Sequence, residues 1–330
     1  MTYSAPAARN RNHVLEDVAW RWVGFGLLVA VLLALDLLVF HRHDRVPSLR
    51  ESAGWTVFWC GLAAAFNALV WWRLGREAGT DFLTGYVIEW SLSMDNVFVF
   101  AVIFRFFQVP PRFQYRVLFW GILGAIVLRL VFVLAGTQLI HRFDWVLPLF
   151  GLLLVYAAIR LVWQSGSEVH PEKSLVLRAA RRLLPVSQGN HAQHGHAFFV
   201  REAGQLSITP LFLVLLVMES TDVLFAVDSV PAVFGITLDP FIVFSSNIFA
   251  VLGLRALYFL LAGVMRIFVY LHYGLAAVLA FVGANMIADF FLTSSGTHLI
   301  ATWAKLLVIA ALLGLAIAAS MMANREETRD

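Results

Sequence analysis

Apolar runs of about twenty residues, separated by short polar segments, dominate this chain. An α-helix rises about 1.5 Å per residue, so roughly 20 mostly apolar residues cross a hydrocarbon core about 30 Å thick. The pattern therefore predicts an all-α, polytopic membrane protein with about nine transmembrane helices. The expected helices lie near residues 19–40, 54–73, 82–107, 115–139, 143–163, 207–235, 240–265, 271–292 and 299–323. The third and the sixth are long enough to be tilted or broken.

The first apolar run is interpreted as a transmembrane helix rather than as a cleaved signal peptide. It follows Arg9, Arg11 and Arg21, has full spanning length, and is not closed by a small-residue cleavage site. If the N-terminus is outside, the inward segments hold more than twice as many Lys and Arg residues as the outward ones. The excess predicts that the C-terminus is cytosolic and that the loop of about 164–206 is cytosolic too.

Composition supports a membrane class and limits the chemistry. Of the 330 residues, 60% are hydrophobic and 14% are charged, and the mean hydropathy is +0.79, a balance that a soluble surface cannot carry. The net charge of +3 comes from basic residues between apolar runs, so membrane lipid rather than nucleic acid is the expected partner. Cys60 is the single cysteine, which excludes an intrachain disulfide and a thiolate metal cluster.

Two stretches resemble each other along the chain. The stretch from Asp95 to Gly136 ends in LRLVFVLAG, and the stretch from Asp222 to Gly263 ends in LRALYFLLAG. Asp95 precedes Arg129 by 34 residues, and Asp222 precedes Arg255 by 33. With the expected topology the copies run in opposite directions, which predicts an inverted repeat with a shared site near the midplane. The alternative is that two apolar helices look alike because Leu, Val and Phe recur.

The expected organisation is a single transmembrane domain over residues 1–330. Repeat one covers about 82–163 and repeat two about 207–292, with the cytosolic loop of about 164–206 between them. The predicted helices 19–40, 54–73 and 299–323 are peripheral.

Carboxylates in the third and sixth apolar runs mark the candidate site. Acids at bilayer depth cost a few kcal/mol each, so they must face one another, a cavity or a cation. Mn²⁺ and Mg²⁺ prefer carboxylate, carbonyl and amide oxygens. The candidate metal-binding residues are Glu89, Ser93, Asp95, Asn96, Glu219, Asp222, Asp228 and Ser229, with Arg129 and Arg255 as supporting intramembrane charges.

Helical geometry divides these residues into groups. At 100° per residue, Glu89, Ser93 and Asn96 share one face, and Glu219, Asp222 and Ser229 share another. Asp95 and Asp228 fall on other faces, so they reach the same site only if a helix unwinds or the cavity is wide. Pro231 cannot donate to the carbonyl of Val227, which predicts a break beside Asp228.

A static salt-bridge network is the alternative to an ion site. In that reading, Arg129 and Arg255 pair with Asp95 and Asp222. Five acids against two arginines nevertheless leave negative charge in excess, which favours a bound cation or protons. Four further polar residues either line a path or, as the favoured reading, make interhelical hydrogen bonds: Asn67, Asn247, Asn285 and Asp289. The loop histidines His191, His194 and His196 either capture metal or are simply solvated, and the solvated reading is favoured.

The runs GYVIEWSLSMDNVFVF and ESTDVLFAVDSVPAVFGITLDPFIVFSSNIFAVLGLRALYFLLAG closely resemble the TerC family of integral membrane proteins, and in particular its Alx-like branch. FDW at Phe143 and FFVR at Phe198 extend the resemblance over nearly the whole chain. The resemblance implies a multi-pass protein of the bacterial inner membrane, associated by naming with tellurite and alkaline-pH responses and by proposed activity with manganese export.

The family's acidic motif positions match residues in both halves of this chain, namely Glu89, Asp95, Asn96, Glu219, Asp222, Asp228 and Ser229. Trp90 and Ser93 occupy positions at which relatives often have other residues. Neither difference removes an oxygen ligand from the set. The histidine run is not a family feature.

The leading expectation is a secondary transporter, not an enzyme, that exports divalent metal ions, most of all Mn²⁺, in exchange for protons and without a resident cofactor. No Walker A motif is present, so ATP is not the direct energy source. An aspartyl hydrolase would need a GxGD-type context, which the sequence lacks. A non-transporting scaffold of a stress-resistance or secretion complex is the remaining alternative. The sequence does not fix the oligomeric state.

Overall fold

The computed structural model describes residues 6–40, 47–163, 175–187, 195, 197–202, 204–262, 270–293 and 299–327. The chain forms two structural units, residues 1–45 and 46–330. The first contains one helix, α1 (Pro6–Phe40). Its segment Ala19–Leu37 is apolar and long enough to span a membrane. This confirms a helix at the first predicted span.

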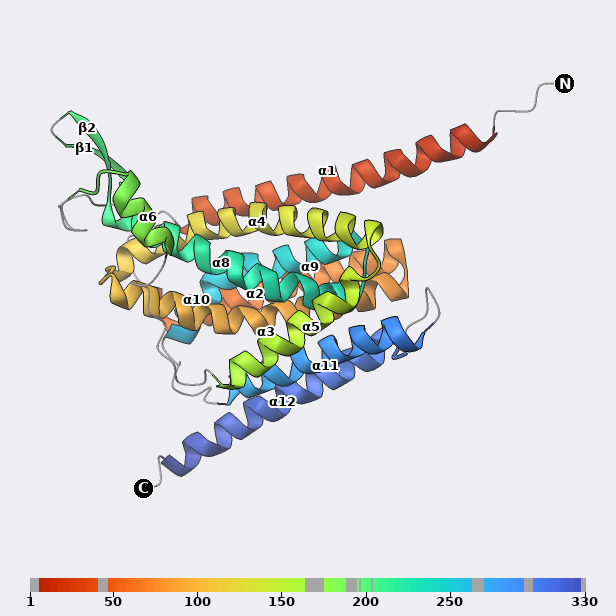
Figure 1. Ribbon diagram of the computed structural model, residues 1–330. Coiled ribbons are helices and arrows are strands. Elements are labelled where there is room, and N and C mark those ends of the chain that lie inside the picture. Colours follow the sequence, from red (N-terminus) through yellow and green to blue (C-terminus); the bar gives the residue numbers. More distant parts are fainter. Residues whose placement is uncertain are drawn as a thin grey trace. The chain divides into compact units, whose positions relative to one another are not determined.

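The second unit is built almost entirely from helices (Figure 1). The helices of its first part are α2 (Leu49–Leu74), α3 (Arg76–Phe106), α4 (Pro111–Arg142), α5 (Val146–Trp163) and α6 (Leu175–Leu183). The helices of its second part are α8 (Pro210–Phe234), α9 (Pro240–Leu252), α10 (Leu254–Ala262), α11 (Leu271–Leu292) and α12 (Thr302–Glu327). Within the described residues, eight helices of the whole chain can span a membrane by length and composition, or nine if the bent pair α9 and α10 is one span. The all-α, polytopic prediction is confirmed.

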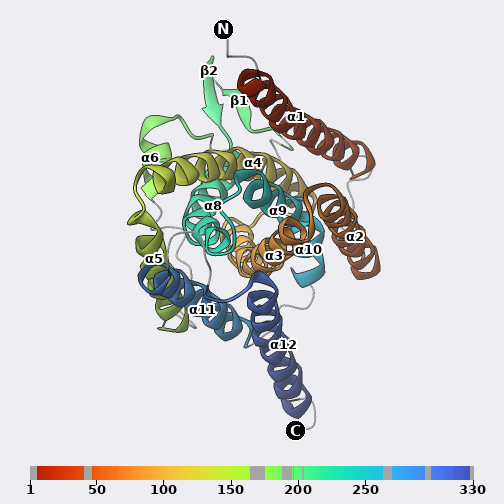
Figure 2. The same cartoon turned by 90° about the vertical axis from the view of Figure 1, so that its right-hand side faces the viewer.

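Helices α3, α4, α8 and α9 form the centre of the second unit, and α2, α5, α11 and α12 lie around them (Figure 2). Each central helix packs on at least two of the others. The central helices carry most of the buried polar side chains of this unit, whereas α12 exposes Leu307, Leu315 and Met322. Apolar side chains on the outside and polar ones in the centre are the arrangement expected in lipid.

Glycines allow α5 and α11 to approach each other closely. A Cβ atom on Gly151 would lie 2.8 Å from the carbonyl oxygen of Gly283, and a Cβ on Gly283 would lie 2.6 Å from that of Gly151. No real Cβ atom fits at these distances, so both positions require glycine. Small residues at helix contacts are the usual means of association in a membrane, where the hydrophobic effect does not drive helices together.

The predicted span 240–265 is two helices rather than one. α9 and α10 meet at Gly253 with a bend of 40°. Asp239 caps α9, accepting from the backbone N–H of Phe241 at 2.8 Å. Glycine lowers helix propensity by about 1 kcal/mol relative to alanine, and here it also lies against Trp59 of α2. A continuous apolar pattern did not reveal this bend.

The predicted break beside Asp228 is wrong, because α8 continues through Pro231 to Phe234. Pro231 lies in the last turn of the helix, and the missing bond to the Val227 carbonyl leaves α8 continuous to Phe234. Residues from Val230 to Ile236 are all buried, so tight packing holds this turn in place.

The predicted cytosolic loop contains regular structure. α6 lies within it, and strands β1 (Phe199–Glu202) and β2 (Gln205–Ile208) form an antiparallel hairpin. Gly204 has a φ of +84°, which a tight turn requires and which glycine adopts without steric cost. The hairpin leads directly into α8, whose N-cap is Thr209.

Candidate ion site within the helix bundle

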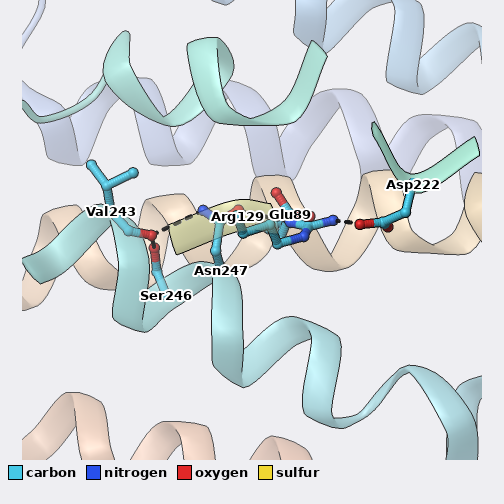
Figure 3. Close-up of polar contacts among 6 residues, drawn as sticks. All are labelled: Glu89, Arg129, Asp222, Val243, Ser246 and Asn247. Atoms are coloured by element: carbon cyan, nitrogen blue, oxygen red, sulfur yellow. Dashed lines mark hydrogen bonds and ion pairs between the residues drawn. The ribbon is translucent and has the colours of Figure 1, made fainter. Parts of the chain in front are cut away.

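Arg129 of α4 lies at the centre of the site and is fully buried. Its Nη1 is ion-paired with Glu89 Oε1 of α3 and donates a hydrogen bond of 2.7 Å to Asn247 Oδ1 of α9. Its Nη2 lies 3.8 Å from Asp222 Oδ1 of α8 (Figure 3). One guanidinium therefore joins four helices, with carboxylates on both sides of it.

Asn247 is oriented by the backbone of its own helix. Its Nδ2 donates to the carbonyl of Val243 at 2.9 Å, and the Ser246 hydroxyl donates to the same carbonyl at 3.1 Å (Figure 3). Because the amide nitrogen is used in this way, the amide oxygen points toward Arg129. The expectation that Asn247 makes an interhelical hydrogen bond is confirmed.

The two paired carboxylates retain unused oxygens. Glu89 Oε2 and Asp222 Oδ2 are buried, and neither has a hydrogen-bond partner within 3.5 Å among the described residues. The hydroxyl of Ser229 lies beside the Glu89 carboxylate. Buried polar atoms are normally satisfied, so unused carboxylate oxygens in an apolar bundle mark capacity for a further cation or proton donor.

Glu219 lies one turn before Asp222 on α8, against the backbone of α4. A Cβ atom on Gly124 would overlap the Glu219 carboxylate, so this glycine makes room for the acid. Glu219 and Asp222 border a small cavity, whose wall on α4 includes Gly121 and Ala125. Its volume of about 10 Å³ holds about one water molecule. The cavity therefore leaves a water-sized space that both acids and α4 border.

Asp95 and Asp228 lie apart from Arg129, as the helical geometry predicts. Both are partly exposed, and neither is within 4.0 Å of a basic side chain in the described part of the chain. Asp228 is within electrostatic reach of Arg160 of α5. Asn96 and Ser93 are buried on α3. The structure thus brings together Glu89, Asp222 and Ser229 with Arg129 and leaves two acids outside this group.

The arginines do not follow the predicted static pairing. Arg129 pairs with Glu89 and Asp222 rather than with Asp95. Arg255 of α10 is buried with its guanidinium 4.2 Å above the ring of Tyr115 on α4. Cation–π contact stabilises a guanidinium in a dry environment. The two arginines therefore have different surroundings, although they occupy matched positions in the sequence.

No group of three or more His, Cys, Asp or Glu side chains among the described residues is arranged to hold a metal ion. In this conformation Arg129 lies between the two buried carboxylates (Figure 3). The eight-residue ligand set stays a prediction. His191, His194 and His196 lie outside the described residues.

A second buried charge cluster lies where α3 and α12 begin and where α8 and α11 end. Lys305 of α12 is almost fully buried, and its Nζ lies 3.5 Å from Asp289 Oδ2 of α11. It also donates to the carbonyl of Gly235 at 3.1 Å, and Asp81 of α3 adds negative charge nearby. Lys305 lies near the start of the predicted helix 299–323, and the sequence prediction did not pair it with Asp289. A lone lysine in the first turn of an apolar helix, preceded by Asp289 at the end of another, is the signal that could have revealed it.

Comparisons with known proteins find relatives among integral membrane proteins. The model of the integral membrane protein TerC family matches residues 74–328. The membrane protein STKORF319 of Myxococcus xanthus is 47% identical over 305 residues, which are 92% of each chain. The Alx protein of Escherichia coli K12, whose name proposes it as a membrane-bound redox modulator, is 45% identical over 280 residues, 82% of this chain and 86% of its own. A membrane protein of Rickettsia felis is 35% identical over 301 residues, 91% of this chain and 97% of its own. No solved structure matches the chain.

Proposed function

The chain belongs to the TerC family of integral membrane proteins, and within this family we propose that it is a secondary transporter of divalent metal ions. The proposed direction is export across the bacterial inner membrane, with Mn²⁺ as the first candidate. In the proposed topology the N-terminus is outside and the C-terminus is cytosolic. Manganese is favoured over magnesium or calcium by the family resemblance, because oxygen ligands serve all three ions.

The observation that carries this proposal is the excess of carboxylates around Arg129. Glu89 and Asp222 contact one guanidinium from two helices inside apolar spans, and Glu219 borders the small cavity beside Asp222. Buried acids that exceed their buried partners are costly in lipid, and a dication offsets two negative charges at once. Glu89 and Asp222 supply carboxylate oxygens, the ligand type that hard cations prefer, and one oxygen of each has no hydrogen-bond partner among the described residues.

Protons are the proposed energy source. Carboxylates that release a metal ion on one side and take up protons on the other couple the two gradients. The export of Mn²⁺ should then depend on the pH difference across the membrane as well as on the ion gradient.

A scaffold in a stress-resistance or secretion complex, associated with tellurite or alkaline pH, is the second candidate. The regular structure in the cytosolic loop favours it, because α6 and the β1–β2 hairpin expose Leu183 and Leu206. A redox role through a pair of thiols within one chain has no basis, since Cys60 is the single cysteine. A scaffold would tolerate neutral residues at Glu89 and Asp222 but would fail when the loop is changed.

The test is Mn²⁺ flux in proteoliposomes with an imposed pH gradient. Glu89→Gln and Asp222→Asn remove one buried charge each and should abolish most of the flux. Glu77→Gln is the matched control, because Glu77 is an exposed acid in the first turn of the same helix as Glu89. Wild-type rates in both buried-acid variants, in protein that elutes as a single species, would reject transport through this site.

A further inference from the structure

Arg129 occupies the set of oxygens that a hard cation would take. Glu89 Oε1, Asp222 Oδ1 and Asn247 Oδ1 come from three different helices and all face its guanidinium (Figure 3). Two carboxylates and one amide oxygen are also typical ligands of a divalent ion. The arginine is thus a cation of the protein itself, lying where the proposed substrate would bind.

The guanidinium and a dication cannot share these oxygens. Like charges a few ångströms apart repel strongly in a low-dielectric interior. Removing both cations is also unfavourable, because it leaves two buried carboxylates without any positive partner. A closed state in which Glu89 and Asp222 are both ionised must therefore hold one of the two cations.

We propose that Arg129 is a built-in counter-ion that replaces the transported cation at Glu89 and Asp222 once the ion has left. Its charge lets the ion-free transporter reorient across the membrane without exposing two bare carboxylates to a dry interior. This inference rests on the proposed transport function. Acids that Arg129 does not hold, such as Glu219, stay open to proton exchange.

The surroundings of Arg129 permit it to withdraw when an ion enters. Its Nε has no hydrogen-bond partner in the described residues, so the side chain is held only through its terminal nitrogens. Side chains in a helix lean toward the N-terminus, which for Arg129 is the turn that includes Ala125. The small cavity borders Ala125, Ile122 and Asp222, so it lies on the N-terminal side of Arg129 along α4.

The experiment separates two modes of transport in proteoliposomes. Exchange is measured with equal Mn²⁺ on both sides and a radioactive tracer on one, and it needs only the ion-loaded transporter to reorient. Net flux into Mn²⁺-free buffer also needs the empty transporter to return. In Arg129→Gln, exchange should stay within a few-fold of wild type, whereas net flux should fall by more than about tenfold, because an uncompensated buried charge must cross.

Arg129→Lys is the second variant, because it keeps the charge and guards against a failure of Arg129→Gln to fold. It should retain both modes, and its half-saturating Mn²⁺ concentration should fall, since one ammonium replaces a planar guanidinium that contacts several oxygens. A rise in that concentration, or net flux lost with exchange kept, would overturn the proposal.

The outcomes for Arg129→Gln also separate the counter-ion role from the transport function on which it rests. If folded Arg129→Gln loses both modes or keeps both, while the wild-type protein transports Mn²⁺, the counter-ion role is wrong and the transport function stands. If the wild-type protein shows neither mode, the proposed function fails, and the counter-ion role fails with it.

Discussion

At the scale of single residues, the site consists of those acids whose helix face is turned toward Arg129. Glu89 and Asp222 meet Arg129, whereas Asp95 is turned away from it on the same helix as Glu89. The rotation of 100° per residue separates Glu89 from Asp95 even though both lie in the same acidic stretch. The site therefore includes only some of the acids in the two acidic stretches.

Gly124 provides a residue-scale test of where Glu219 lies. Gly124→Ala places a methyl group where the Glu219 carboxylate now sits, so it should displace that acid and lower Mn²⁺ flux. Gly61→Ala on α2 is the control, because a Cβ atom there meets nothing within 4 Å. Thermal unfolding should show a loss in Gly124→Ala that becomes smaller when Glu219→Ala is added, since neighbouring changes couple. Equal losses in the single and double variants would contradict this placement.

Much of the residue-scale picture was predictable, and the remainder had clear physical reasons for being missed. The acids stand out because they interrupt apolar runs, and their grouping follows from helix periodicity. The partner of each acid did not follow, because Arg129 lies 40 residues from Glu89 in sequence and packing decides which of several acids it meets. The pairing with Asp95, which the matched spacing suggested, was wrong for that reason.

At the scale of elements, the spans were predicted well and their interruptions were not. Continuous apolar runs give the number and approximate position of the helices, because a bilayer requires that length. The break fell at Gly253 rather than near Pro231, since the buried residues around Pro231 hold that turn of α8 in place while a glycine between two packed helices permits a bend. The hairpin of β1 and β2 was missed because its strands are only four residues each.

The cluster of Lys305, Asp289 and Gly235 offers a test at this scale, because it joins α12 to the ends of α8 and α11. Lys305→Met removes the ammonium that lies against Asp289, and breaking a buried ion pair costs about 3–5 kcal/mol. The melting temperature of the purified protein in detergent should therefore fall clearly. The double variant Lys305→Met with Asp289→Asn should recover part of the loss. A melting temperature equal to wild type in Lys305→Met would show that the cluster does not hold these helices together.

At the scale of the whole molecule, the membrane class and the family are shown, while the inverted repeat stays a prediction. Its two arginines occupy different environments, one among carboxylates and one over the Tyr115 ring. The first copy would thus supply Arg129 and Glu89, and the second would supply Asp222 and Asn247. Such a division of roles is compatible with an alternating transporter, in which one site near the midplane serves both faces.

Equilibrium binding of radioactive Mn²⁺ to the purified protein tests the central claim most directly, because it needs no assumption about direction or coupling. The wild-type protein should bind the ion saturably, and the double variant Glu89→Gln with Asp222→Asn should lose that binding while it remains folded. The exposed-acid variant Glu77→Gln should bind as the wild type does. Unchanged Mn²⁺ binding in the folded double variant would contradict an ion site between these two helices.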